Sequence, residues 1–223
     1  MKLYSGPLSL FSRKVEIALH EKGLSFEREM VSFTQAKGYS PKHPAVLAAN
    51  PKAQVPVLVD GDLTLFDSTL IFEYFEDSHP QPALWPADPK ARARGRQVEL
   101  FADEILLPLV ARLMHRSEPP DSDAERRERR DAEARLAESA LAARYGQLAD
   151  QLQGKDFFCG TYSYADIAMF MVVFWALRLK GPRLGTVPAL ESWYERVGAR
   201  PAVARVAAEI IAAYRELSPA LYS

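Results

Sequence analysis

Two serines, Ser9 and Ser12, stand three residues apart where an amphipathic helix is predicted to begin. Apolar residues recur at helical spacing through Phe11–Lys22, and Gly23 follows as a stop signal. A serine at a helix start either caps the helix with its oxygen or offers its hydroxyl proton to an anion. The partial positive charge of a helix N-terminus favours the same anion, so the residues alone leave both explanations open.

Two further motifs can likewise be explained either by local structure or by ligand binding. Asp67 and Ser68 precede a second predicted helix over Ser68–Asp77, where both residue types are favoured caps and where free N–H groups can hold a carboxylate. Val55-Pro56 precedes a predicted strand. An X-Pro bond is cis more often than other peptide bonds, but trans is the default, and proline also simply opens strands.

These motifs belong to a predicted mixture of short strands and helices. The order is β-α-β-α-β-β-α, with Asp60-Gly61 as a hairpin turn between the last two strands. The strands are expected at Lys2–Ser5, Ser25–Val31, Pro56–Val59 and Leu63–Leu65, and the helices at Phe11–Lys22, Pro41–Ala49 and Ser68–Asp77.

A proline-rich segment over His79–Pro89 interrupts any helix or central strand, because proline lacks a backbone donor and fixes φ. Beyond it the pattern is helical, and Ile167–Leu177 predicts a buried helix, too short to span a bilayer. The charge-dense Asp123–Arg135 indicates a solvated helix face, or a basic contact surface for a partner. The helices are expected near 91–115, 124–153, 164–178, 188–199 and 201–216.

Composition narrows the function classes. A net charge of −1 argues against a general electrostatic grip on nucleic acid or anionic lipid. With Cys159 as the single cysteine and no apolar signal-peptide core at the start, we expect a cytoplasmic protein without membrane attachment. The four histidines show no metal-ligand spacing, so no metal cofactor is expected.

Three ordered motifs resemble those of the cytosolic glutathione transferase superfamily: residues 9–15 (SLFSRKV), 50–56 (NPKAQVP) and 66–68 (FDS). Ser163–Asp166 is similar to the capping box of its helical domain. The resemblance implies a thioredoxin-like α/β domain over residues 1–78, a linker over 79–90 and an all-helical domain over 91–223. The likeness is greatest to the bacterial branch that contains stringent starvation protein A.

The resemblance also implies roles for residues. A cis Val55-Pro56 would pair the Val55 backbone with glutathione, while Asp67 and Ser68 would hold its γ-glutamyl end. Ser9 matches the position of the thiolate-activating residue of serine- and cysteine-type transferases, and Ser12 is the alternative. Further candidates for substrate binding are Phe11, Lys42, Gln54, Pro56, Met114 and His115, of which Lys42 is equally well explained as a solvated loop lysine.

Two functions follow from the resemblance. The first is a homodimeric, serine-type glutathione transferase that uses glutathione as co-substrate against a small apolar electrophile. The second is a regulator that binds RNA polymerase without transferase activity, with His79–Pro82 as its contact. Ser9 favours the first, because members of the starvation-protein branch can carry an acidic residue there, and a carboxylate would repel a thiolate.

Overall fold

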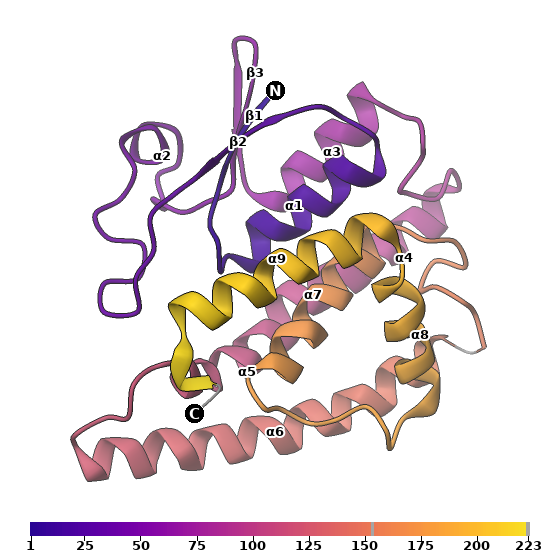
Figure 1. Ribbon diagram of the computed structural model, residues 1–223. Coiled ribbons are helices and arrows are strands. Elements are labelled where there is room, and N and C mark those ends of the chain that lie inside the picture. The colour runs from indigo at the N-terminus through magenta and orange to yellow at the C-terminus, as the bar shows by residue number, and fades with distance from the viewer. Residues whose placement is uncertain (153, 222–223) are drawn as a thin grey trace. The chain divides into compact units, whose positions relative to one another are not determined.

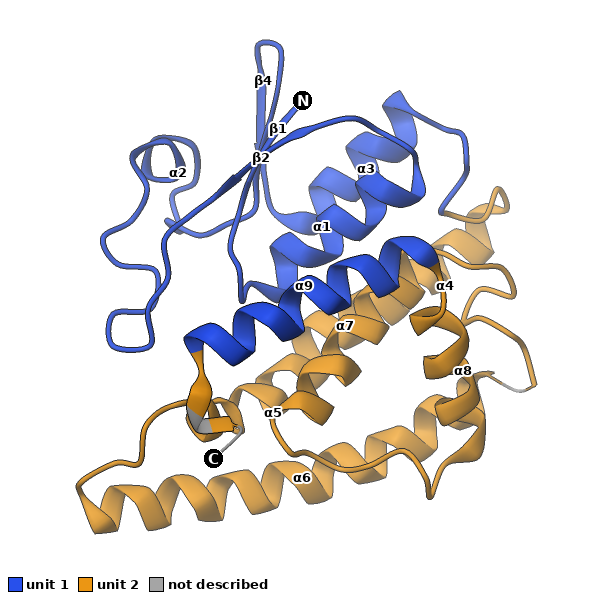
Figure 2. Ribbon diagram, viewed as in Figure 1, with its two compact units in different colours: residues 1–84, 201–217 blue, residues 85–200, 218–223 orange. Residues whose placement is uncertain are grey.

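Residues 1–152 and 154–221 are described by a computed structural model, and their packing divides the chain into two units (Figure 2). Unit 1 comprises Met1–Leu84 and Pro201–Leu217, and unit 2 comprises Trp85–Arg200 and Ser218–Ser223. Residues 153 and 222–223, which belong to the expected span 91–223, lie outside the described residues. The units reflect packing, and the domain boundaries expected from the sequence stay a prediction.

Unit 1 contains a four-stranded mixed sheet in the order β2-β1-β3-β4. Its strands are β1 (Lys2–Ser5), β2 (Glu27–Met30), β3 (Val57–Asp60) and β4 (Leu63–Phe66). β1 and β2 run parallel, whereas β3 is antiparallel to both β1 and β4. The hairpin turn uses Gly61 at φ 61°, a conformation that glycine adopts without steric cost. The predicted order of strands and helices along the chain, β-α-β-α-β-β-α, is confirmed.

Helices cover both faces of this sheet, with α1 and α3 on one face and α2 on the other (Figure 1). They are α1 (Leu10–Glu21), α2 (Pro44–Ala49) and α3 (Ser68–Ser78). A small apolar core beneath α2 is built on Val31, Val46 and Val57. This arrangement confirms the thioredoxin-like fold. α2 begins three residues later than expected, because His43 caps it and Pro44 occupies its first position.

Unit 1 also includes α9 (Pro201–Leu217), which packs against α1. Its buried residues Val203, Val206 and Ile210 recur at helical spacing and form the packed stripe. α1 is covered by the sheet on one side and by α9 on another, which explains why every residue of α1 from Ser12 to Leu19 is buried. The sequence shows only one apolar face of α1, because its buried charged residues look like a solvated face.

Unit 2 is helical in its described residues, which confirms the all-helical character expected for this part of the chain. The helices are α4 (Pro89–Leu100), α5 (Leu107–Ala111), α6 (Ala124–Leu152), α7 (Tyr164–Arg178) and α8 (Pro188–Gly198), with 3₁₀ turns at Met114–Ser117 and Pro219–Leu221. Every residue of α7 from Tyr164 to Ala176 is buried, as predicted for its apolar run, and the capping box at Ser163 and Asp166 is confirmed.

The single helix expected near 91–115 is wrong. A π-helix over Phe101–Leu106 separates α4 from α5, and the N–H of Leu107 reaches the carbonyl of Ala102 five residues earlier. Pro108 explains the widened turn, because it has no N–H to donate and its ring collides with the carbonyl four residues before it. The helix ends after Ala111 and a 3₁₀ turn follows.

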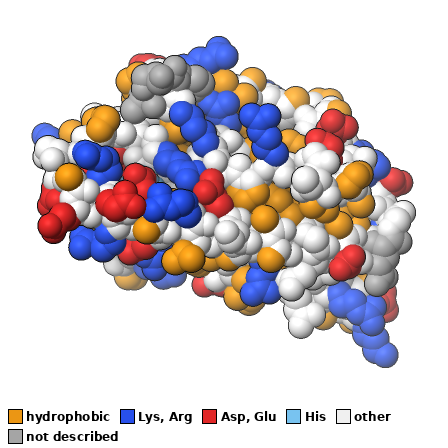
Figure 3. All heavy atoms as spheres, turned by 90° about the horizontal axis from the view of Figure 1, so that it is seen from below, with side chains coloured by type: hydrophobic (Ala, Val, Ile, Leu, Met, Phe, Trp, Pro, Cys, Tyr) orange, Lys and Arg blue, Asp and Glu red, His pale blue; other side chains and the backbone are white. Residues whose placement is uncertain are grey.

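The charged start of α6 is a solvated network of ion pairs. Arg126 and Arg130 both bond to acidic residues of the preceding loop, Asp121 and Glu118 respectively. Figure 3 shows Lys/Arg and Asp/Glu side chains next to one another on the face seen from below. This supports the solvated-face interpretation over a basic contact surface. No helix in the described part of the chain is long and apolar enough to cross a bilayer.

Candidate functional site

Strand register brings the three predicted motifs to one end of the sheet. Val57 on β3 pairs with Tyr4 on β1 and with Phe66 on β4. Because both pairings are antiparallel, the residues after Tyr4, before Val57 and after Phe66 leave the sheet at the same end of the strands. We call the segments that meet at this end of the sheet the motif edge; it consists of residues 6–9, 54–56 and 67–68.

Ser9 is the N-cap of α1, which begins at Leu10 rather than at Phe11. The Ser9 Oγ accepts two hydrogen bonds from Ser12, one from its backbone N–H at 3.3 Å and one from its hydroxyl at 3.0 Å. Ser12 is fully buried, whereas Ser9 is partly exposed. The interpretation of Ser12 as the N-cap of α1 is therefore wrong. Ser9 is the cap, and Ser12 donates both hydrogen bonds that hold the Ser9 Oγ in place.

These two bonds fix what the Ser9 hydroxyl can still do. A serine hydroxyl has one proton to donate and two acceptor positions, and Ser12 occupies both acceptor positions. The Ser9 proton is therefore left to donate. The described first turn of α1 carries no acidic side chain, so the helix end favours an anion as the acceptor.

Asn50 shapes the loop that leads to Val55-Pro56. Its side-chain oxygen accepts the N–H of Lys52 at 2.9 Å, and its amide donates to the carbonyl of Gln54 at 2.6 Å. The Val55-Pro56 peptide bond is cis. Across the described residues, neither the N–H nor the C=O of Val55 has a hydrogen-bond partner, so both are available to an added extended chain.

Asp67 and Ser68 form the start of α3. Asp67 is its N-cap, and the Asp67 carboxylate accepts the N–H of Thr69 at 3.0 Å. Asp67 has φ 77° and ψ 125°, a region that side-chain-bearing residues rarely adopt. Ser68, the first residue of α3, is buried with 4% exposure. Asp67 binds the N–H of Thr69, so its second carboxylate oxygen and the N–H groups of Ser68 and Leu70 are the groups that can hold opposite charges at this helix start.

The loop candidates Lys42 and Gln54 lie before and after α2, and His43 is the N-cap of that helix. Lys42 is exposed, with its Nζ 6.0 Å from the ring centre of Tyr39. His43 Nδ1 accepts the N–H of Ala45 at 3.2 Å, so its proton is on Nε2, which lies 2.7 Å from Glu29. Gln54 is exposed and its carbonyl is already bound to Asn50. Of these, Lys42 and the Gln54 side chain are open to a ligand.

Phe11 is the second residue of α1 and is partly exposed. The buried Lys14 Nζ sits 5.4 Å from the Phe11 ring and 5.2 Å from the ring of Phe72 on α3. Cation–π contacts of this kind hold the two aromatic rings on either side of the ammonium group. The described contacts thus give Phe11 a packing role between α1 and α3.

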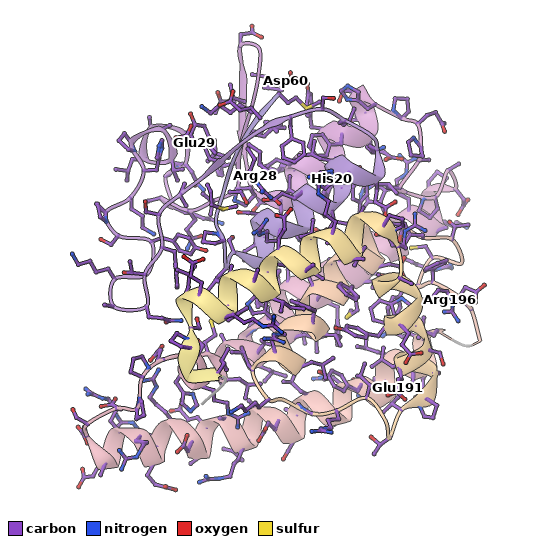
Figure 4. All side chains as sticks on the ribbon, in the orientation of Figure 1. His20, Arg28, Glu29, Asp60, Glu191 and Arg196 are labelled. Carbon is purple, nitrogen blue, oxygen red and sulfur yellow. The ribbon has the colours of Figure 1, made fainter. Side chains whose placement is uncertain are left out.

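A buried ion network underlies the loop that carries Ser9. Arg13, 2% exposed, donates to Glu16 at 2.6 Å and to Glu209 of α9 at 3.0 Å. Arg28, labelled on β2 in Figure 4, donates to the same two carboxylates. Glu16 also accepts the hydroxyl of Ser5 at the end of β1. Burial raises the pKa of Glu209, but the hydrogen bonds and charges of Arg28 and Arg13 outweigh it and lower that pKa overall.

Met114 and His115 lie in unit 2, in the 3₁₀ turn before α6. His115 is held at both ring nitrogens, by the carbonyl of Arg112 at 3.1 Å and by Asp131 at 2.9 Å, and its hydrogen bond lowers the pKa of Asp131. Met114 is 39% exposed. Met114 is therefore available for contact with an apolar molecule, whereas the polar atoms of His115 are occupied within unit 2.

Sequence patterns missed the residues that support the motif edge. Asn50 had a signal, since Asn before Pro51 is typical of a turn in which the amide binds the backbone two residues on. Arg13 and Glu16 had none, because charged residues three apart on a helix usually face solvent. In the part of the chain that the structure describes, no three of its His, Cys, Asp and Glu side chains group as metal ligands.

Two family models match this chain. One, described as the N-terminal domain of glutathione S-transferase, matches residues 3–83, and the other, described as its C-terminal domain, matches residues 101–201. The first model covers all three segments of the motif edge. The resemblance that residues 9–15, 50–56 and 66–68 carry is thereby confirmed.

Individual relatives match over different lengths. A stringent starvation protein A homolog from Coxiella burnetii is 42% identical over 98 residues, 43% of each chain. Glutathione S-transferase 3 from Zea mays is 31% identical over 222 residues, 94% of each chain. A sphingomonad glutathione S-transferase solved in complex with glutathione is 28% identical, with a TM-score of 0.73, over 94% of this chain and 98% of that one.

The chain spans about half the length of the first curated relatives it matches, and nearly the whole length of the maize enzyme. The maize match over 94% of each chain includes the regions that both family models match. The chain therefore belongs to the glutathione S-transferase family, with stringent starvation protein A homologs among its relatives.

Proposed function

We propose that this chain is a cytoplasmic, homodimeric glutathione transferase of the serine type, in which Ser9 stabilises the thiolate of bound glutathione. The observation that carries the proposal is the pair of hydrogen bonds from Ser12 to Ser9 Oγ, which leaves the Ser9 proton as the group to donate. The N-terminus of α1 adds its partial positive charge at the same point.

The energies are sufficient for this role. A free thiol has a pKa of ~8.5, so only about 3% of it is thiolate at pH 7. Lowering that pKa by ~2 units requires about 2.7 kcal/mol. A hydrogen bond to a charged group contributes roughly 1.5–3 kcal/mol and a helix end roughly 0.3–1 kcal/mol. The thiol proton passes to solvent, and the thiolate then attacks a carbon of the electrophile. The S–C bond forms as that carbon either loses a leaving group with its bonding electrons or, at an activated double bond, gives up the π electron pair, which then takes a proton from solvent.

The rest of glutathione would lie along the motif edge. The unpaired N–H and C=O of Val55 offer it two backbone bonds, as to an added strand. The start of α3 would take the γ-glutamyl end, with Ser68 and the free N–H groups on its carboxylate and Asp67 on its ammonium. Gln54 and Lys42 are proposed for the glycyl end.

The described residues say less about the electrophile than about glutathione. Membership of the glutathione S-transferase family and the apolar side chains of the helical part of the chain suggest a small apolar molecule. Met114 is its proposed contact, because the side chain is 39% exposed. His115 is proposed for the same contact through the face of its ring, since Arg112 and Asp131 occupy its nitrogens.

Two serine variants test the proposal. In Ser9→Ala the thiol of bound glutathione should titrate one to two pH units higher, turnover near pH 7 should fall about ten- to a hundredfold, and turnover should recover in alkali. Affinity for glutathione should change little. Thiolate absorbance of the bound peptide against pH is the measurement.

Ser12→Ala is the matched control, and it should produce a smaller shift because it removes only the hydroxyl bond to Ser9 Oγ and keeps the bond from the backbone N–H. A shift in Ser12→Ala without one in Ser9→Ala would mean that the wrong serine has been named. A wild-type protein that binds glutathione without lowering its thiol pKa would contradict the catalytic role itself.

The second candidate function is regulation through RNA polymerase, and the starvation-protein relatives favour it. Buried Lys22 donates to the carbonyls of His79 and Pro82 at 2.8 and 2.9 Å, which fixes a loop with exposed Pro80 and Gln81. Such a loop is suited to docking. The wild-type thiol titration separates the two functions, because a docking protein needs no lowered thiol pKa.

A further inference from the structure

Tyr39 reaches from the segment between β2 and α2 to the loop that precedes Ser9. Its hydroxyl oxygen accepts the backbone N–H of Leu8 at 3.1 Å. Its ring covers Gly6 so closely that a Cβ at Gly6 would lie 2.6 Å from the Tyr39 hydroxyl oxygen and 2.7 Å from a ring carbon. Only glycine at position 6 admits the ring in this place, so the two residues fit each other.

Tyr39 is itself held in place from behind. It packs against the core of Val31, Val46 and Val57 under α2, and its ring centre lies 4.8 Å from that of Phe33. Burial raises the pKa of the Tyr39 hydroxyl, so the group stays neutral and keeps its oxygen for the N–H of Leu8. The hydrogen bond from Leu8 to Tyr39 thus connects residues 6–9 to the small apolar core beneath α2.

The loop is also held at its neighbouring residues. Arg13 Nε donates to the carbonyl of Pro7 at 3.4 Å, and the N–H of Ser9 bonds to the carbonyl of Gly6 at 3.2 Å. The Pro7–Leu8 peptide is therefore held at its carbonyl by Arg13 and at its N–H by Tyr39, and the next peptide, Leu8–Ser9, is held at its N–H by the carbonyl of Gly6.

We propose that Tyr39 is a positioning residue for Ser9: its hydroxyl fixes Leu8 and thereby aims the Ser9 proton at the thiolate. The inference rests on the proposed function of Ser9 and deepens it. It assigns a role in thiolate stabilisation to a side chain thirty residues from the serine, on a loop where the sequence shows no motif.

Tyr39→Phe tests the role, because it keeps the ring over Gly6 and removes only the hydroxyl. Turnover at pH 7 should fall about three- to tenfold, as expected for one neutral hydrogen bond. The thiol titration should move to higher pH, and KM for glutathione should change less than about twofold. Tyr4→Phe is the matched control, since it removes a hydroxyl from the same core without touching Leu8, and it should leave all three quantities unchanged.

The double variant Ser9→Ala with Tyr39→Phe distinguishes positioning from direct contact. If Tyr39 acts through Ser9, the double variant should be no slower than Ser9→Ala alone. Effects that multiply would overturn the proposal, because Tyr39 would then be a second donor to the thiolate. An unchanged titration in a folded Tyr39→Phe protein would overturn it as well.

Amide hydrogen exchange in the ligand-free protein tests the contact without glutathione. Leu8 should exchange faster in Tyr39→Phe than in the wild type and in Tyr4→Phe. Unaltered exchange would overturn the proposal even if Ser9 proves catalytic. Faster exchange in a protein whose wild type does not stabilise the thiolate would instead refute the function of Ser9 and retain the structural contact.

Discussion

Asp67 combines a helix cap with an unfavourable backbone conformation. A side-chain-bearing residue at φ 77° and ψ 125° costs roughly 1–3 kcal/mol, and such residues gather at binding sites where the surroundings enforce them. Here the end of β4 and the start of α3 leave one residue to make the turn. Such a conformation at a residue of the motif edge supports a role for the Asp67 carboxylate in holding the ammonium group of a ligand.

Asp67→Asn should separate the two roles of this residue. Asparagine caps a helix as well as aspartate does, so stability should stay within about 1 kcal/mol of the wild type. Affinity for glutathione should fall about ten- to a hundredfold, because a hydrogen bond between charged groups is lost. Calorimetric titration and thermal unfolding measure the two quantities.

Asp88→Asn makes the same change at another N-cap, where Asp88 accepts the N–H of Ala91 at 2.7 Å. It should leave glutathione binding unaffected. Equal losses of affinity in Asp67→Asn and Asp88→Asn would show that the effect comes from helix capping and not from ligand recognition.

At the residue scale, the sequence predicted the polar groups of the motif edge but not their supports. Ser9, Asp67 and Ser68 stand at helix starts, which local patterns reveal. Tyr39 lies in a loop and acts on a residue 31 positions away, so no local pattern could indicate it. Which of two serines caps α1 was equally out of reach, because their burial depends on the packing of α1 in unit 1.

Among the elements, α9 is joined to the sheet by charge as well as by apolar packing. Glu209 binds Arg13 and Arg28, and each of these two arginines also binds Glu16. A further residue of α9 affects His20 of α1, which is labelled in Figure 4: burial, then the charge of Arg205, lowers the pKa of His20. A helix distant in the sequence thus carries one of the four charges beneath the Ser9 loop.

Glu209→Gln should destabilise the protein by about 1–3 kcal/mol at neutral pH, the usual range for a hydrogen bond to a charged group. Because the folded-state pKa of Glu209 lies below the ordinary glutamate value of 4.5, its stabilisation is present above about pH 4.5 and is lost as pH falls through the folded pKa. The difference between variant and wild type should therefore shrink below pH 4.5.

Denaturant unfolding at several pH values measures this difference. Glu216→Gln, on the exposed side of the same helix, is the control and should change stability by less than about 0.5 kcal/mol at every pH. A constant difference between Glu209→Gln and wild type across pH would show that the carboxylate charge is not the source of the stabilisation.

Elements with strong local signals were predicted closely. Elements in which two local signals oppose each other, such as helical spacing and a proline, were not. α7 begins and ends where its capping box and apolar run indicate. The segment near 91–115 has helical spacing throughout, and that spacing hides what Pro108 does to the backbone upstream. Proline marks a break reliably, but the π-helix that accommodates it depends on how the chain continues on both sides.

At the scale of the whole molecule, we predict a homodimer. Large apolar side chains remain exposed on both units: Leu63 at 37% and Leu70 at 56% on β4 and α3, and Leu100 at 57% on α4. Exposed apolar groups on adjoining elements of unit 1 are typical of an interface. Sedimentation at micromolar concentration should give twice the chain mass of 25.0 kDa.

Leu70→Glu should shift the protein toward the monomer, because burying a charge in an apolar interface is unfavourable. Leu47→Glu is the control: Leu47 is 54% exposed, but it lies on α2, and its substitution should leave the mass unchanged. A wild-type protein that sediments at the chain mass would contradict the dimer, as would a Leu70→Glu variant with an undiminished mass.

The order of motifs along the chain predicted the family and both kinds of architecture, since a resemblance that recurs in sequence order is specific even where each motif is weak. The packing partner of α9 was not predictable in this way. Its apolar stripe shows that one face is buried, but a stripe of Val203, Val206 and Ile210 does not specify which surface covers it.

The membership of α9 in unit 1 has a consequence for synthesis. A ribosome completes the sheet, α1 and α3 by Leu84, and must then translate all of Trp85–Arg200 before Glu209 exists. During that interval Arg13 and Arg28 share the single carboxylate of Glu16, and the side of α1 that α9 covers is open to other molecules in the cell. The nascent chain therefore carries a nearly finished unit 1 whose last contact depends on its most distant part.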